Sequence, residues 1–95
     1  MIRLMIVDDN DEIRSYFRMI LSREPDIEMV GDAATGRDGV RLAQQLIPDV
    51  VLMDIQMETD TAGIDAAAQI HATLPQCKVI ILTIHSDDEM LFQAY

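Results

Sequence analysis

Apolar residues along this chain fall into four short, nearly continuous runs. The runs cover residues 2–7, 27–33, 49–53 and 78–83. Aliphatic runs of this length without polar alternation are typical of strands that are covered on both faces, as in a parallel sheet flanked by helices. The pattern therefore predicts four buried, parallel strands.

The segments between the runs place apolar residues three and four positions apart, which predicts helices. The expected helices cover residues 11–23, 37–47 and 62–74, and a proline follows each of them closely. A fourth helix is expected to begin at Ser86, because Glu89 three residues later completes a capping box. Strands that alternate with helices in this way predict an α/β fold with right-handed crossovers.

Polar side chains stand where three of the predicted strands end. Asp8 and Asp9 follow the first strand, Asp54 follows the third, and Thr83 closes the fourth. Because parallel strands all end at one edge of the sheet, where ligands bind, we expect these side chains to lie together. Clustered carboxylates raise each other's pKa unless a cation relieves the repulsion, and all-oxygen ligands suit Mg²⁺. The sequence therefore predicts a magnesium site at this edge.

The same residues also allow other interpretations. Asp8 and Asp9 are suited to capping the first helix, and Thr83 is suited to a strand simply because it is β-branched. A carboxylate at this edge can instead act as a nucleophile toward phosphorus and form an aspartyl phosphate. Three acids and a hydroxyl at one edge favour metal and phosphate chemistry over capping.

The composition restricts the partners that this chain can have. The 95 residues carry a net charge of −10, with the acids spread along the chain, so no basic surface for nucleic acid is expected. The single cysteine, Cys77, cannot form an internal disulfide and suits a small buried position at the start of a strand. The pattern contains neither a signal peptide nor a membrane span, so one cytoplasmic domain is expected.

Three stretches carry a family resemblance: "MIVDD", "VVLMDIQM" and "IILT". In this order and spacing they resemble the receiver domain of bacterial two-component response regulators. "EPDIEMVGDAATGRDGV" and "LTIHSDDE" are similar to receivers of the NarL/LuxR type of transcription factor. The resemblance covers the whole chain and implies a flavodoxin-like (CheY-like) doubly wound parallel sheet in the order 2-1-3-4. It also implies a sensor histidine kinase as the phosphoryl donor.

The resemblance implies a role for each residue at the acidic edge. Asp54 would be the phosphoacceptor and Thr83 the switch hydroxyl. Asp9 and Asp54 would hold Mg²⁺ together with the backbone carbonyl of Gln56. Asp8 would support the metal through water. Such a domain accepts a phosphoryl group and helps to catalyse its own phosphorylation and dephosphorylation, rather than acting on a separate substrate.

The chain departs from the family pattern in two places. Glu58 stands where the family usually has a proline, and Gly63 comes one residue later than usual. The loop "METDTAG" is therefore expected to be more mobile, with Glu58 and Asp60 either solvated or drawn into the metal shell. The family's fifth strand, the lysine that ends it and the fifth helix do not follow in these 95 residues. Lys78, the only lysine, stands about 16 Å from Thr83 at ~3.3 Å per residue, so it cannot replace the family's lysine.

The chain is accordingly interpreted as a truncated receiver domain over residues 1–95, with no output domain. Without a fifth strand the fourth-strand edge is expected to be exposed, which favours self-association through that edge and residues 86–95. A non-switching fragment that acts as a dimerising interaction module is therefore the alternative function. A hydrolytic phosphatase is a third interpretation, disfavoured because Gln56 stands where such enzymes carry a second acid.

Overall fold

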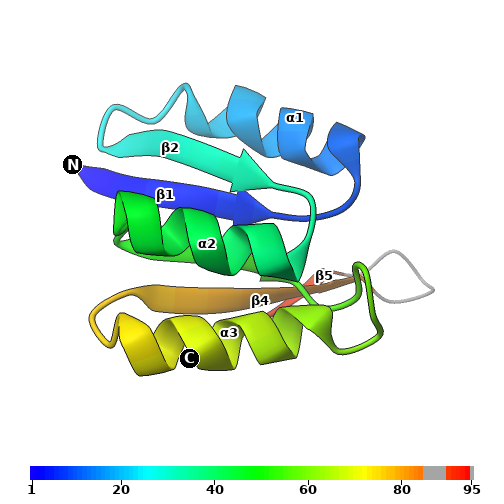
Figure 1. Ribbon diagram of the computed structural model, residues 1–95. Coiled ribbons are helices and arrows are strands. Elements are labelled where there is room, and N and C mark those ends of the chain that lie inside the picture. Colours follow the sequence, from blue (N-terminus) through cyan, green and yellow to red (C-terminus); the bar gives the residue numbers. More distant parts are fainter. Residues whose placement is uncertain (85–89, 95) are drawn as a thin grey trace.

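The computed structural model describes residues 1–84 and 90–94, with only the backbone described for residues 83, 84 and 90–94 (Figure 1). The elements in chain order are β1 (Ile2–Val7), α1 (Asp11–Leu21), β2 (Ile27–Ala33), α2 (Gly36–Leu46), β3 (Val50–Asp54), α3 (Ala62–Thr73), β4 (Lys78–Ile84) and β5 (Met90–Ala94). The four predicted strands and the first three predicted helices are thus confirmed to within a few residues at their ends. None of the helices in the described part of the chain is long and apolar enough to cross a membrane.

The strands form one sheet in the order β2-β1-β3-β4-β5. The first four strands are parallel, which confirms the α/β class and the predicted order 2-1-3-4. One irregularity interrupts the pairing of β1 with β2. Leu4 pairs with Met29 and the next residue, Met5, pairs with Gly31, so Val30 forms a β-bulge.

The predicted fourth helix is wrong for residues 90–94. These residues form β5, which runs antiparallel to β4 with Ile84 opposite Met90 and Ile80 opposite Ala94. An unpaired strand edge offers a row of backbone donors and acceptors, and pairing with them outweighs a local helical preference. The prediction that the edge of the fourth strand is exposed is also wrong, because β5 pairs with that edge. The residues of the expected capping box, Ser86 and Glu89, lie outside the described part of the chain.

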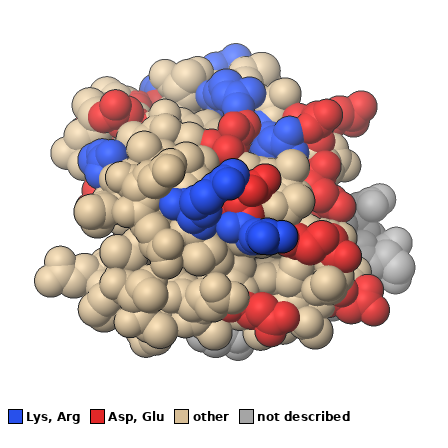
Figure 2. Space-filling model, viewed as in Figure 1, with Lys and Arg blue, Asp and Glu red and all other residues tan. Residues whose placement is uncertain are grey.

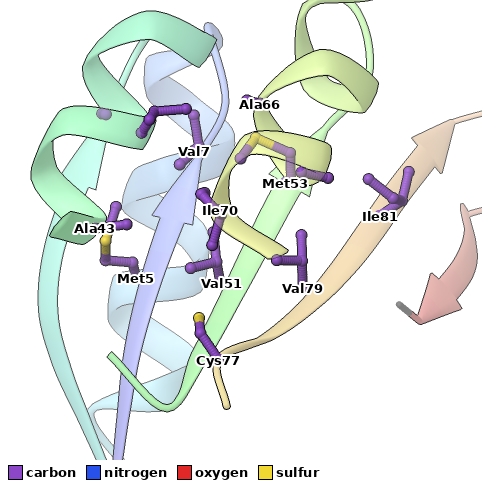
Figure 3. Packing of buried hydrophobic residues seen from close by; sticks show 13 residues of the cluster. Met5, Val7, Ala43, Val51, Met53, Ala66, Ile70, Cys77, Val79 and Ile81 are labelled. Carbon is purple, nitrogen blue, oxygen red and sulfur yellow. The ribbon is translucent and has the colours of Figure 1, made fainter. Parts of the chain in front are cut away.

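Helices cover both faces of the sheet, with α1 on one side and α2 and α3 on the other (Figure 1). On the α2–α3 side, alternate residues of the central strands point into the larger part of the core (Figure 3). The strand residues of this cluster that are fully buried are Met5, Val7, Val51, Met53, Val79 and Ile81. Cys77 is also buried there as a free thiol, as its position in the sequence predicted.

The opposite face is built from the residues in between. Leu4 and Ile6 of β1 pack there beneath Ile13 and Phe17 of α1. Because neighbouring residues of a strand point to opposite faces, both sets must be apolar, which explains the uninterrupted runs in the sequence.

Helix α2 ends at a residue with an unusual backbone. Ile47 adopts the left-handed conformation with φ 49°, its N–H donates to the carbonyl of Ala43 at 2.8 Å, and its carbonyl accepts from the Nη1 of Arg3 at 2.9 Å. A left-handed residue at this position ends many helices, but it is usually glycine or asparagine. The β-branched side chain makes this turn strained.

Candidate functional site

Three carboxylates meet at the edge where the parallel strands end. Asp8 and Asp9 follow β1, and Asp54 is the last residue of β3, the strand beside β1. One carboxylate oxygen from each residue lies within 4.8 Å of the others. Figure 2 shows acidic side chains gathering along the edge toward which β1 and β2 point. The predicted convergence of these three acids is therefore confirmed.

The carboxylates open into a cavity of about 430 Å³. Its lining residues are Asp8, Asp9, Asn10, Ile13, Asp54, Ile55, Gln56 and Leu82. At about 30 Å³ for each water molecule, this volume can hold a hydrated cation together with a small oxyanion. The donors are all oxygens, which is the chemistry that Mg²⁺ prefers in proteins. The residues present therefore fit a magnesium ion.

The electrostatics of the cavity favour such a cation. Burial, and then the charges of Asp8 and Asp9, raise the pKa of Asp54 to about 6. Burial is also the main cause that raises the pKa of Asp8, which is only 3% exposed. Both groups resist ionisation because negative charges are crowded here in a partly desolvated space. A divalent cation would reverse this effect by pairing with the ionised carboxylates.

Asp8 is fixed by the turn that leads into α1. Its Oδ1 accepts the N–H of Asn10 at 2.9 Å, and its backbone carbonyl accepts from the Nη1 of Arg14 at 2.6 Å. The cap of α1 is Asn10, whose side-chain oxygen accepts the N–H groups of Glu12 and Ile13. The alternative interpretation of Asp8 and Asp9 as the cap is therefore wrong. Both carboxylates remain at the cavity instead.

A tight return of the chain supports Asp54. After β3 the chain forms a loop and comes back so closely that the N–H of Gly63 donates to the carbonyl of Ile55 at 2.7 Å. A Cβ atom at Gly63 would stand 1.7 Å from the backbone carbonyl oxygen of Asp54. Only glycine permits this approach, so Gly63 belongs to the scaffold of the site. The shifted position of Gly63 is visible in the sequence, but this close approach to the backbone of Asp54 is not.

Glu58 has a partner that the sequence did not indicate. Its Oε1 accepts the N–H of Gly36 at 2.7 Å and its Oε2 accepts the N–H of Arg37 at 3.0 Å. Burial acts to raise the pKa of Glu58, but hydrogen bonds from Gly36, from Arg37 and from its own backbone N–H outweigh it and lower the pKa. Glu58 is exposed to solvent, which agrees with one of the two expectations for it, but its carboxylate is also held at the start of α2 and is not among the three that meet at the cavity. Asp60, the other acid of this loop, is exposed.

The remaining predicted residues lie at different distances from the cavity. Gln56 lines it. The backbone of Thr83 lies near the end of β4, and its side chain is outside what the structure describes. Lys78 begins β4 opposite Val50, at the far edge of the sheet, as predicted.

Comparisons with known proteins agree with this geometry. The family model for the response regulator receiver domain matches residues 4–95. The transcriptional regulatory protein LiaR of Bacillus subtilis is 44% identical over 92 residues, which cover 97% of this chain and 43% of LiaR. The response regulator protein VraR of Staphylococcus aureus is 40% identical over 93 residues, which cover 98% of this chain and 44% of VraR. The chain thus spans less than half the length of these relatives.

A solved structure shows the same fold. The two-component response regulator of the LuxR family from Aurantimonas sp. SI85-9A1 superimposes with a TM-score of 0.81 at 30% identity, over 90% of this chain and 61% of that one. The likeness therefore extends over most of the fold of this chain.

Proposed function

The chain belongs to the response regulator receiver family, and we propose that it accepts a phosphoryl group on Asp54 from a sensor histidine kinase in the presence of Mg²⁺. The convergence of Asp8, Asp9 and Asp54 within 4.8 Å at the end of the parallel strands is the observation that carries this proposal. Membership in the family supplies the donor class, since receiver domains take their phosphoryl groups from histidine kinases.

Asp54 is the acid best placed to be the nucleophile. It is the last residue of β3 and opens into the cavity between Asp8, Asp9 and Gln56. A carboxylate oxygen of Asp54 forms a bond to the phosphorus of the donor phosphohistidine as the phosphorus–nitrogen bond breaks. The imidazole nitrogen keeps the electron pair of that bond.

The neighbouring groups would hold the cation. We assign Asp9, Asp54 and the backbone carbonyl of Gln56 as direct ligands, with Asp8 acting through water. When bound, Mg²⁺ supplies the positive charge that offsets repulsion between the carboxylates and the incoming phosphoryl oxygens. Thr83, at the end of the adjacent strand, would donate its hydroxyl to a phosphoryl oxygen and report phosphorylation to the rest of the protein.

The setting of this activity follows from the relatives. LiaR is a transcriptional regulatory protein, and we propose that the present chain is the receiver of a transcriptional regulator that works in the cytoplasm. The alternative role as a dimerising fragment finds less support, because β5 pairs with the edge of β4 that such a dimer would use.

Phosphorylation of the purified chain tests the proposal. The chain is incubated with Mg²⁺ and acetyl phosphate, and its intact mass is measured. We expect a gain of one phosphoryl group, which is absent without Mg²⁺ and absent in Asp54→Asn. Asp60→Asn removes the same charge from the loop that follows β3 and should still be phosphorylated. A mass gain that persists in Asp54→Asn, or no gain in the unaltered chain, would refute the assignment.

A further inference from the structure

Glu58 joins the loop that follows Asp54 to the first turn of α2. Its two carboxylate oxygens accept the N–H groups of Gly36 and Arg37, which are 22 and 21 residues away in the sequence. The first N–H groups of a helix have no partners within the helix, and the positive end of the helix dipole favours a carboxylate. Thr35 caps α2 by accepting the N–H of Asp38, so Glu58 satisfies two further donors of the same turn.

The fit between loop and helix is close. A Cβ atom at Gly36 would lie 2.8 Å from the carbonyl oxygen of Ala62, the first residue of α3. The beginnings of α2 and α3 therefore approach each other over Gly36, and the loop between β3 and α3 lies beside them. Glu58 can reach both N–H groups because glycine keeps this approach short.

Gln56 lies between two fixed points of this loop. On one side the carbonyl of Ile55 accepts the N–H of Gly63 at 2.7 Å, which closes the base of the loop. On the other side Met57 packs against the core and donates its N–H to the carbonyl of Thr59 at 3.1 Å. Glu58 follows immediately and ties the turn to α2.

We propose that Glu58 is a positioning residue, which holds the loop against α2 so that the backbone carbonyl of Gln56 stays at the acidic cavity as a ligand for a divalent cation. This inference rests on the proposed function, because it assumes that the cavity binds Mg²⁺. A partner that orients a metal ligand without touching the metal typically changes the affinity by about tenfold or more when it is removed.

The contact itself is tested first, by hydrogen exchange of the Gly36 and Arg37 amides in NMR spectra without metal. We expect both amides to exchange faster in Glu58→Ala than in the unaltered chain. Asp60→Asn, which changes an exposed acid of the same loop, should leave both rates unchanged. Equal exchange in Glu58→Ala and the unaltered chain would overturn the inference.

The consequence is tested by titration with Mg²⁺ alone, at a temperature where circular dichroism shows every variant to be folded. We expect Glu58→Ala to raise the Kd about tenfold. Glu58→Gln should lie between, because its amide oxygen can still accept one of the two N–H groups. Asp60→Asn, which removes the same formal charge, should change the Kd less than about twofold.

The outcomes separate this inference from the proposed function. If the unaltered chain binds Mg²⁺ and Glu58→Ala binds it equally well, the positioning role is wrong while the proposed function stands. An equal loss of Mg²⁺ affinity in Glu58→Ala and Asp60→Asn would show that the effect comes from the removal of one negative charge. That result would also overturn the positioning role. If the unaltered chain does not bind Mg²⁺, the proposed function fails and this inference fails with it.

Discussion

Gly63, at the start of α3, lies against the backbone of Asp54, at the end of β3. A Cβ atom on Gly63 would come within 1.7 Å of the carbonyl oxygen of Asp54 and within 2.7 Å of the Cα of Ile55. Both neighbours are backbone atoms, so they cannot move aside without displacing the end of the strand. The position of the Asp54 carboxylate therefore depends on residue 63 having no side chain.

Replacing Gly63 with alanine should disturb the site and the fold together. We expect Gly63→Ala to lower the free energy of unfolding by at least about 2 kcal/mol and to weaken binding of Mg²⁺. Urea denaturation and Mg²⁺ titration measure the two effects. Gly31→Ala is the matched control, because a Cβ there meets the flexible end of Leu46 at 2.9 Å rather than backbone. Equal costs for the two variants would contradict this account.

Asp54 should make the metal-free protein less stable at neutral pH than in acid. Its pKa rises from 3.8 to about 6 in the folded state, so between these pH values the folded protein holds the proton more tightly than the unfolded chain does. This contribution to stability is complete below the lower value and is lost as the pH rises through about 6. Asp54→Asn has no ionisable group at this position, so its stability should not fall in this way as the pH rises.

The substitution isolates this effect. At about pH 7.5 without metal, we expect Asp54→Asn to raise the free energy of unfolding by on the order of 1 kcal/mol, after allowance for the partial exposure of the group. At about pH 4 the difference should nearly vanish. Urea denaturation at both pH values is the measurement, with Asp60→Asn as the control for loss of one acidic charge. A gain of the same size at both pH values would show that the cause is not ionisation.

Arg14 should contribute more to the free energy of unfolding than the arginines that form exposed ion pairs. It is only 16% exposed, donates to the carbonyl of Asp8, and forms ion pairs with Asp11 and Asp32. We expect Arg14→Ala to cost about 1–2 kcal/mol, because it leaves a partly buried carbonyl and carboxylate with fewer partners. Arg41→Ala, which breaks the exposed pair with Asp38, should cost less than about 0.5 kcal/mol. Thermal unfolding measures both, and equal costs would argue against the role of burial.

The left-handed backbone of Ile47 offers a route to a more stable protein. Ile47 has φ 49° and is 61% exposed, so this strained residue buries little apolar surface. Asparagine tolerates this conformation, and we expect Ile47→Asn to raise the free energy of unfolding by about 0.5–1 kcal/mol. Ile47→Val keeps the branched Cβ and should bring no gain. Urea denaturation decides, and a gain from valine would mean that the strain is not the cause.

The parts of the structure that could be predicted from the sequence are those that depend on burial and on parallel topology. Met5 and Val7 point to one face and Leu4 and Ile6 to the other, and this two-sided burial produced the apolar runs. The meeting of the acids at one edge also follows from the parallel topology, because parallel strands all end at the same edge of the sheet. The cap at Asn10 was also visible as a typical capping residue before the acidic first turn of α1, although it was overlooked.

The parts that could not be predicted depend on contacts between segments that are distant along the chain. Glu58 is hydrogen-bonded to Gly36, 22 residues before it, and nothing in the local pattern of "METDTAG" points to that partner. Residues 90–94 have a helical pattern, but pairing with β4 decides their conformation. Neither contact is predicted because a local preference of a fraction of a kcal/mol per residue is smaller than the gain from satisfying backbone groups elsewhere.

The bulge at Val30 reverses which residues of β2 point to each face of the sheet. In an unbroken strand Asp32 would share a face with Val30, toward α2, whereas Met29 would share a face with Gly31. The extra residue exchanges the faces for everything after it, so Asp32 lies on the α1 side with Arg14 and Arg18, and Ala33 enters the core beneath α2. The bulge therefore decides which face of the sheet Asp32 occupies. If the same residues alternated regularly without it, the carboxylate of Asp32 would point into the core beneath α2.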